Sequence, residues 1–193
     1  MKKSIDLIKR SVLENIALKK NVIKQSKKIS ILVDKIFDCL NNKGKVFICG
    51  NGGSASDAQH LAAEMMVRLN PNVNRRPYPV ISLALDISTL TAISNDYNFN
   101  KIYDRTLDAL ATKADLLITI STSGNSKNII NVLKKAKKKK IFSISFLGNK
   151  GGSCKNLSDL SYVVPSNDVA RIQETHIFIG HLILNLVEKK LIK

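Results

Sequence analysis

The segment DLLITISTSGNS, from Asp115 to Ser126, is the clearest indication of the fold class of this chain. Its first half is a short run of apolar and β-branched residues, which is typical of a strand buried on both faces of a parallel sheet. Its second half is rich in hydroxyl side chains and contains a glycine, which predicts a loop. A helical pattern continues to about Lys139. The segment therefore reads as one strand–loop–helix unit.

The same order recurs along the chain. We expect further strands near residues 45–50, 79–84, 140–147 and 160–164, and helices near 56–69, between 85 and 112, and at 169–191. Strands that alternate with helices predict a parallel sheet covered on both faces. Apolar residues at spacings of three and four over residues 4–42 predict N-terminal helices. The prediction is one α/β domain over residues 1–193, with a doubly wound, five-stranded parallel sheet and an N-terminal helical extension.

The helix expected at residues 169–191 is apolar around most of its circumference. A helix of this kind is buried on all sides. In a chain of 193 residues, we expect part of this surface to pack against another subunit. The N-terminal helices within residues 1–42 offer a second surface for oligomer packing.

Composition excludes several classes of protein. No apolar run reaches the ~18 residues of a membrane-spanning helix, and the segment after Met1 leads into a charged helix instead of the apolar core of a signal peptide. The three cysteines are an odd set without metal-binding spacing, which indicates reduced thiols. We therefore expect a cytoplasmic protein with no membrane partner.

The formal net charge of +16 suggests nucleic acid as a partner, but the kind of basic residue argues against it. Only six of the 31 basic residues are arginine, the residue that reads bases and phosphates most directly. The densest run, Lys134 to Lys140, fits the solvated carboxyl end of a helix. We expect no nucleic-acid partner, although the charge favours phosphorylated ligands by electrostatic steering.

The loop after the strand at 115–120 is a candidate phosphate site, because ligands of open parallel sheets bind beyond the carboxyl ends of the strands. It combines hydroxyl side chains, amides freed by Gly124 and a helix N-terminus, which together suit an anion. It has no lysine and no GxxxxGK[ST] pattern, so it predicts a phosphomonoester and not a nucleoside triphosphate. The alternative is a polar turn in which Ser126 caps the next helix.

A second loop, Gly50 to Ser54, contains glycines that allow a ligand to approach the backbone closely. Just after it, His60 and Glu64 stand one helical turn apart on one face. Such a pair can hold a divalent metal or act as an acid–base pair. Taken alone, it is more often a surface contact.

Two further pairs have ordinary structural interpretations as well. Gln173 and His181 lie among apolar neighbours on the last helix, where a lone histidine is usually a satisfied core residue. Asn95 and Asp96 close another helix and are compatible with a C-cap and turn.

Taken together, four motifs resemble a known family, the bacterial phosphoheptose isomerases of the SIS (sugar isomerase) fold. The motifs are CGNGGSASDAQHLAAE (Cys49 to Glu64), SNDYNF (Ser94 to Phe99), ISTSGNS (Ile120 to Ser126) and RIQETHIFIGH (Arg171 to His181). They stand in the order and at the spacing of the family and cover essentially the whole chain, although STSGNS alone is shared by all SIS domains.

The resemblance implies a flavodoxin-like SIS fold and an activity. Family members convert sedoheptulose 7-phosphate into D-glycero-D-manno-heptose 7-phosphate through an enediol. The product feeds ADP-heptose for the lipopolysaccharide core or GDP-heptose for surface glycans. Members are cytoplasmic homotetramers with active sites at subunit interfaces, and many bind one zinc ion per subunit.

The resemblance also implies a role for each matching residue. The zinc ligands would be His60, Glu64, Gln173 and His181. The phosphate would bind Ser121, Thr122, Ser123 and Ser126. The sugar would contact Asn51, Gly52, Gly53, Asn95 and Asp96, with Glu64 and Gln173 also in contact. Glu64 would be the base and His181 the acid.

One part of this assignment conflicts with helix geometry. Gln173 and His181 are eight residues apart, roughly 12 Å along a helix and about 80° around it. One metal ion is therefore hard to reach from both residues of one straight helix. Either Gln173 lies in an irregular first turn of the helix, or one of the two residues comes from a neighbouring subunit, and we favour the second. A carboxylate bound to zinc is also a poorer base, so the ion could instead position the substrate.

Two other functions remain as alternatives. Some tetrameric SIS relatives are adaptors that bind the replication initiator, but they typically lack the glutamate that Glu64 supplies here. A sugar-phosphate-sensing regulator would need a DNA-binding module, and residues 1–42 show no helix-turn-helix with an arginine-bearing recognition helix. The sequence therefore favours the enzyme.

Overall fold

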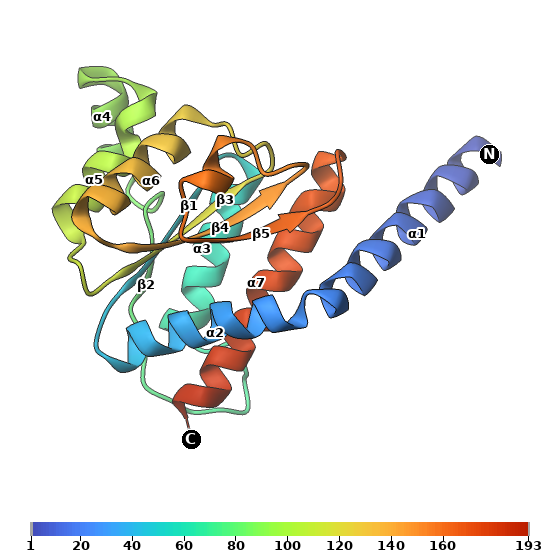
Figure 1. Cartoon of the computed structure of the whole chain (residues 1–193), viewed down its shortest axis with the longest axis horizontal. Helices are drawn as coiled ribbons and strands as arrows, with labels where there is room; N and C mark the ends of the chain where they lie inside the picture. Colours follow the sequence, from blue (N-terminus) through green and yellow to red (C-terminus); the bar gives the residue numbers. More distant parts are fainter. Residues whose placement is uncertain (1, 193) are drawn as a thin grey trace.

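The computed structural model describes residues 2–192 and is built around one five-stranded parallel sheet. The strands are β1 (Val46–Gly50), β2 (Val80–Ser82), β3 (Leu116–Ser121), β4 (Phe142–Gly148) and β5 (Leu160–Val164). Their order across the sheet is β2-β1-β3-β4-β5, which is the order of flavodoxin-like doubly wound sheets. The predicted architecture is confirmed, and β2 and β5 form the two edges of the sheet (Figure 1).

Helices cover both faces of this sheet (Figure 1). They are α1 (Lys2–Lys24), α2 (Ser26–Asn41), α3 (Gly53–Met66), α4 (Ile87–Asp96), α5 (Ile102–Leu110), α6 (Lys127–Lys139) and α7 (Val169–Leu191), with short 3₁₀ turns η1 (Phe99–Lys101) and η2 (Ser153–Asn156). One core lies between the sheet and α2, α3 and α7, and a second lies between the sheet and α5 and α6.

The central strands explain the two cores. In β1, Val46 and Ile48 point into the α2–α3–α7 core, whereas Phe47 and Cys49 point into the α5–α6 core. Every residue of β1 and β3 is buried. Because both faces are covered, these strands read as continuous apolar runs and not as alternating ones.

The N-terminal extension forms two helices with a break at Gln25 between them. The predicted helices are confirmed, but they differ in how they pack against the rest of the chain. α2 buries a full apolar stripe against the body, whereas α1 extends away from it (Figure 1). Along α1, large apolar side chains such as Ile8, Leu13 and Ile23 are exposed. This helix therefore has an apolar surface that its own chain leaves uncovered.

The strand order also locates the crevice for a ligand. The chain passes from β1 outward to β2 and then returns to β3 on the other side of β1. The loops after β1 and β3 therefore flank the topological switch point, where open α/β sheets bind ligands. These are the two loops that the sequence analysis singles out.

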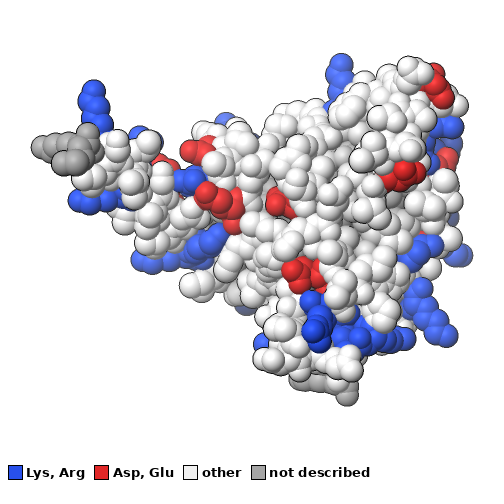
Figure 2. All heavy atoms as spheres, turned by 180° about the vertical axis from the view of Figure 1, so that it is seen from behind, with Lys and Arg blue, Asp and Glu red and all other residues white. Residues whose placement is uncertain are grey.

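The lysine run lies at the carboxyl end of α6, as expected. Lys135 and Lys139 both pair with Asp108, and Lys140 ends the helix with φ +58°. On the face seen in Figure 2, basic side chains form several separate groups. Across residues 2–192, none of the helices combines the length and apolar character needed to cross a bilayer.

One buried residue links this fold to pH. His176 of α7 is fully buried, and neither ring nitrogen has a hydrogen-bond partner within residues 2–192. Burial lowers the pKa of its imidazole to about 4, from 6.5. The folded protein therefore keeps this ring neutral at a pH where the unfolded chain binds a proton.

We expect His176 to make the fold sensitive to acid. Its contribution is fully present above about pH 6.5 and is lost as the pH falls to about 4, a change of about 3 kcal/mol. Urea unfolding at several pH values measures this. The loss of stability over this window should be smaller in His176→Leu than in the wild type, and an equal loss in both proteins would contradict the account.

Candidate functional site

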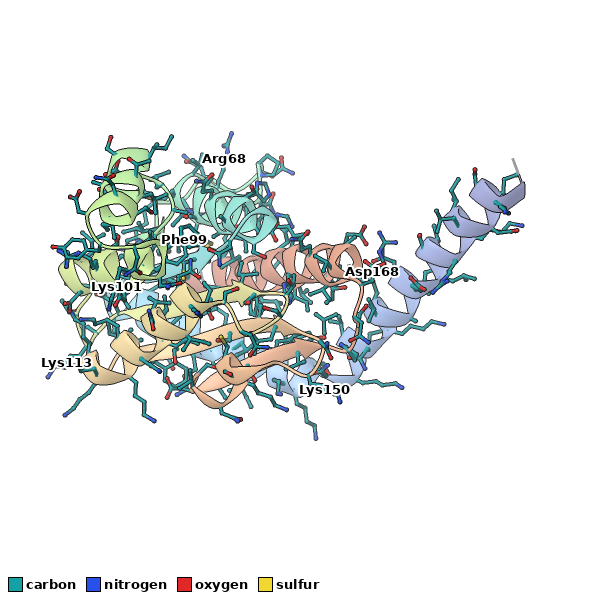
Figure 3. The ribbon with its side chains drawn as sticks, turned by 90° about the horizontal axis from the view of Figure 1, so that it is seen from above. Arg68, Phe99, Lys101, Lys113, Lys150 and Asp168 are labelled. Carbon is teal, nitrogen blue, oxygen red and sulfur yellow. The ribbon has the colours of Figure 1, made fainter. Side chains whose placement is uncertain are left out.

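The site is built on the contact between α3 and α7, which we call the α3–α7 seam. The two helices run in the same direction on one face of the sheet, with Asp168 at the start of α7 and Arg68 just beyond the end of α3 (Figures 1 and 3). A Cβ added at Gly180 would lie 2.6 Å from Leu61 Cδ1. The absence of a side chain there allows the two helices to approach closely.

Three of the predicted site residues meet across this seam. His60 and Glu64 project from α3, and His181 joins them from α7; their ligand atoms all lie within 4.8 Å of one another. The two histidine Nε2 atoms are 2.9 Å apart, and His60 Nε2 is 3.4 Å from Glu64 Oε1. The pair on α3 is thus part of a cluster that two helices assemble, and not an isolated surface contact.

The surroundings favour a neutral imidazole at His181. Burial is the largest cause that lowers the pKa of His181, and the nearby His60 lowers it further, whereas Glu64 acts in the opposite direction. A neutral ring has a lone pair for a metal ion or a proton. Two imidazoles and one carboxylate are also the protein donors of one common type of catalytic zinc site, in which a further position stays open. The residues present therefore fit a zinc ion.

Gln173 does not belong to this cluster within one chain. α7 is one helix from Val169 to Leu191, so Gln173 lies roughly 12 Å along the axis from His181. Its side chain lies against the start of α3, where a Cβ added at Gly53 would be 2.9 Å from Gln173 Nε2. The conflict expected from helix geometry is therefore present, and a metal-ligating role for Gln173 remains a prediction.

The predicted phosphate loop connects β3 to α6. Ser121 Oγ accepts a hydrogen bond from the amide of Gly124 at 3.1 Å. Gly124 has φ +66°, and a Cβ there would lie 2.0 Å from the carbonyl oxygen of Gly151, so only glycine fits this turn. Ser126 stands at the N-cap of α6, but its side chain makes no capping hydrogen bond. Its hydroxyl is therefore available to an anion.

A residue that the sequence analysis missed joins the two loops. Asn128, in the first turn of α6 and 1% exposed, exchanges two side-chain hydrogen bonds with Asn51, of 2.9 and 2.7 Å. No local pattern signals a pair of asparagines 77 positions apart. The pair fixes the predicted sugar-binding loop relative to the predicted phosphate loop.

Asn51 and Gly52 also line a pocket of about 250 Å³ that faces α4. Its other lining residues are Ala55, Ser56, Gln59, Ala84, Leu90, Ser94, Phe99, Ile102 and Tyr103. Phe99 lines this pocket from the η1 turn, and Lys101 is the last residue of the same turn (Figure 3). The pocket extends the crevice at the switch point toward α4.

Asn95 and Asp96 are the last two residues of α4 and are exposed. Asn95 Nδ2 donates a hydrogen bond to Asp96 Oδ1 at 3.0 Å. The structure does not bring them to the metal-ligand cluster, and α4 has no buried residue. Their contact with a sugar therefore remains a prediction.

Asp57, three residues before His60 on α3, was not predicted from the sequence as a site residue. Its Oδ2 is buried and has no hydrogen-bond partner within residues 2–192. Burial raises the pKa of this carboxyl, and the nearby His60 opposes the shift. The spacing of Asp57, His60 and Glu64 along one face of a helix could have identified it.

Comparison with known proteins agrees with this geometry. The sequence model of the SIS-domain family matches residues 13–148. Curated phosphoheptose isomerases from Helicobacter pylori (strain P12) and Clostridium acetobutylicum are 44% and 41% identical to this chain over 185 and 189 residues. These alignments cover 95% and 96% of this chain, and 95% of each relative.

Solved structures give the same result. A phosphoheptose isomerase from Francisella tularensis superposes with a TM-score of 0.91 at 32% identity, covering 96% of this chain and 98% of that one. The enzyme from Neisseria gonorrhoeae gives 0.88 at 34% identity, covering 95% and 98%. The agreement includes the sheet, the flanking helices and nearly the full length. The chain belongs to the phosphoheptose isomerases, aldose–ketose isomerases of the SIS-domain family.

Proposed function

We propose that this chain interconverts sedoheptulose 7-phosphate and D-glycero-D-manno-heptose 7-phosphate at the cluster of His60, Glu64 and His181. The observation that carries the proposal is the convergence of two imidazoles and a carboxylate within 4.8 Å, from two helices far apart in the sequence. The names of relatives that align over nearly the whole chain support the substrate. The alternative, an adaptor for the replication initiator, is not favoured, because the cluster retains Glu64.

The phosphate end of the substrate binds the loop between β3 and α6. Ser121, Thr122, Ser123 and Ser126 supply hydroxyls, and the N-terminus of α6 supplies amides and a partial positive charge. The loop after β1, with Asn51, Gly52 and Gly53, lines the sugar together with Asn95 and Asp96. Holding the distant phosphate orients the reacting carbons and lowers the entropic part of the barrier.

Glu64 carries the proton between the two reacting carbons. Its carboxylate removes a proton from C1 of the ketose, which gives an enediol, and returns the proton to C2, which gives the aldose. The proton on the C1 oxygen must leave and one must reach the C2 oxygen. His181, whose pKa lies below the usual histidine value, serves this second transfer as acid and acceptor.

A zinc ion would be held by His60, Glu64 and His181, with Gln173 of the partner subunit as a fourth ligand. When bound, it would supply charge that stabilises the enediolate oxygens. The proposed stoichiometry is one ion per subunit. Because metal coordination reduces the basicity of Glu64, the ion and the proton transfer place opposing demands on the same carboxylate.

We also propose that the chain is a single SIS domain that works as a homotetramer with active sites at subunit interfaces. A groove of about 1590 Å³ runs between α1, α2 and α7. Apolar residues on both of its sides, such as Ile16, Ile23, Phe178 and Leu186, are exposed in one chain. A second copy that brings its own N-terminal helix covers such a surface by apolar burial.

Substituting Glu64→Gln tests the role of the base. We expect the turnover of sedoheptulose 7-phosphate to fall about 100- to 10,000-fold, with an unchanged circular dichroism spectrum. Asp38→Asn, which alters an exposed carboxylate on α2, should retain full activity. Turnover at the wild-type rate in Glu64→Gln would show that another group moves the proton.

Zinc binding is tested by stability, independently of turnover. A ligand at 100 times its Kd stabilises the folded state by about 2.7 kcal/mol, so we expect zinc to raise the Tm of the metal-stripped protein. The rise should be lost in His181→Ala and retained in His176→Gln, which changes a histidine outside the cluster. An equal rise in His181→Ala would place the ion elsewhere.

The assembly is tested by native mass spectrometry. We expect a mass of four chains for the wild type and a smaller assembly for Ile23→Lys, because this change puts a charge in the groove. Ile31→Lys is the matched control, since Ile31 is an exposed apolar residue of α2 that does not line the groove. A monomeric wild type with full activity would rule out a shared site.

A further inference from the structure

A buried ion pair closes the far end of the α3–α7 seam. Arg75, in the segment between α3 and β2, pairs with Glu188 of α7, and Arg75 Nε lies 2.6 Å from Glu188 Oε1. The side chains are only 3% and 2% exposed. Neither residue belongs to the metal-ligand cluster, and neither has a part in the proton transfer described above.

The same guanidinium binds the last turn of α3. Arg75 Nη2 donates to the backbone carbonyl of Glu64 at 2.9 Å, and Nη1 donates to that of Met65 at 2.8 Å. A helix leaves its last carbonyls without partners inside the helix, and a cation is favourable at that end. Glu188 Oε1 also accepts a hydrogen bond from the amide of Leu69 at 3.3 Å. We call Arg75, Glu188 and these two carbonyls the clamp.

The clamp lies on the same face of α7 as His181, which belongs to the cluster with His60 and Glu64. Glu188 follows His181 by seven residues, close to two full turns, so both lie on the face of α7 that meets α3. His181 contacts His60 on that face, and Glu188 reaches the end of α3 through Arg75. One rigid connection therefore runs from the backbone of Glu64 to the helix that carries His181.

We propose that Arg75, with Glu188 as its counter-ion, is a positioning residue for Glu64. It holds the carbonyl of Glu64 and so fixes the axial position and rotation of that turn of α3 relative to His181. The inference rests on the proposed function in one respect, namely that Glu64 is the reactive carboxylate. Arg75 itself contacts no reacting atom.

The choice of residue type supports a role in orientation. A buried ion pair is a weak source of stability, because desolvation offsets most of the attraction, and apolar residues of similar size often serve the fold as well. Arginine, however, offers five N–H donors in a planar fork, and lysine cannot reproduce that geometry. In this protein the fork contacts a carboxylate and two successive carbonyls at once.

The first experiment compares Arg75→Lys with Arg76→Lys. Arg76 is the matched control, because it is exposed and lies over the same Tyr78 ring, 5.1 Å from the centroid against 5.2 Å for Arg75. We expect Arg75→Lys to lower kcat about 10- to 100-fold, as displacements near 1 Å do. KM for sedoheptulose 7-phosphate and inhibition by inorganic phosphate should stay within about threefold, because the phosphate loop is remote. Arg76→Lys should match the wild type.

A purely structural role is separated by a double variant. Arg75→Met alone leaves a buried, unpaired carboxylate and is expected to unfold the protein. Arg75→Met combined with Glu188→Met removes both charges and should restore the fold, with a Tm close to that of the wild type. It should still show the low kcat, because the carbonyl of Glu64 loses its Arg75 donor, whereas that of Met65 keeps the amide of Tyr78 as a donor at 3.2 Å.

The inference is overturned if the double variant turns over at the wild-type rate, or if kcat per folded molecule of Arg75→Lys is unchanged. Arg75→Lys decides the question if the double variant does not fold. Zinc affinity, measured by calorimetry, gives a readout that does not depend on turnover. It should weaken in Arg75→Lys and in the double variant. Full activity of Glu64→Gln together with weaker zinc binding by the Arg75 variants would have two consequences. It would rule out Glu64 as the base, and it would still support the positioning role of Arg75.

Discussion

The parallel packing of α3 against α7 is what brings His60, Glu64 and His181 together. Close approach is possible because Gly180 presents no side chain to Leu61. At that distance His60 and His181 face each other across the seam with 2.9 Å between their Nε2 atoms. A side chain at position 180 would clash with Leu61, because an added Cβ would lie 2.6 Å from Leu61 Cδ1. The geometry of this cluster is therefore a consequence of helix packing.

The position of the predicted phosphate loop has a different origin. It follows from the strand order, which places the loops after β1 and β3 on either side of the switch point. Gly53 begins α3 beside these loops, and Glu64 follows eleven residues later, about 16 Å along the helix. Topology thus sets the position of the predicted phosphate loop, and helix packing sets that of the cluster of His60, Glu64 and His181. This separation is one reason to expect that neighbouring subunits complete the site.

The sequence predicted most of the fold, because the strands are buried on both faces and so read as short apolar runs. The bounds of β5 and α7 agree with the prediction, and the isomerase family was recognised from four motifs. His60 and Glu64 could be paired from helical spacing alone. The contacts of Asn128 with Asn51 and of Arg75 with Glu188 could not, because each joins distant segments and depends on tertiary packing. Helix geometry did predict that Gln173 and His181 of one chain are too far apart to bind the same ion.

Subunit complementation shows whether one chain supplies both histidines of the cluster. Inactive His60→Ala and His181→Ala proteins are unfolded together, refolded as a mixture and assayed with sedoheptulose 7-phosphate. If α3 and α7 of the same chain form the cluster, every mixed assembly lacks one histidine at each site, and no activity returns. Activity that rises well above that of either variant alone would show that the two histidines meet across a subunit interface, which would contradict the account.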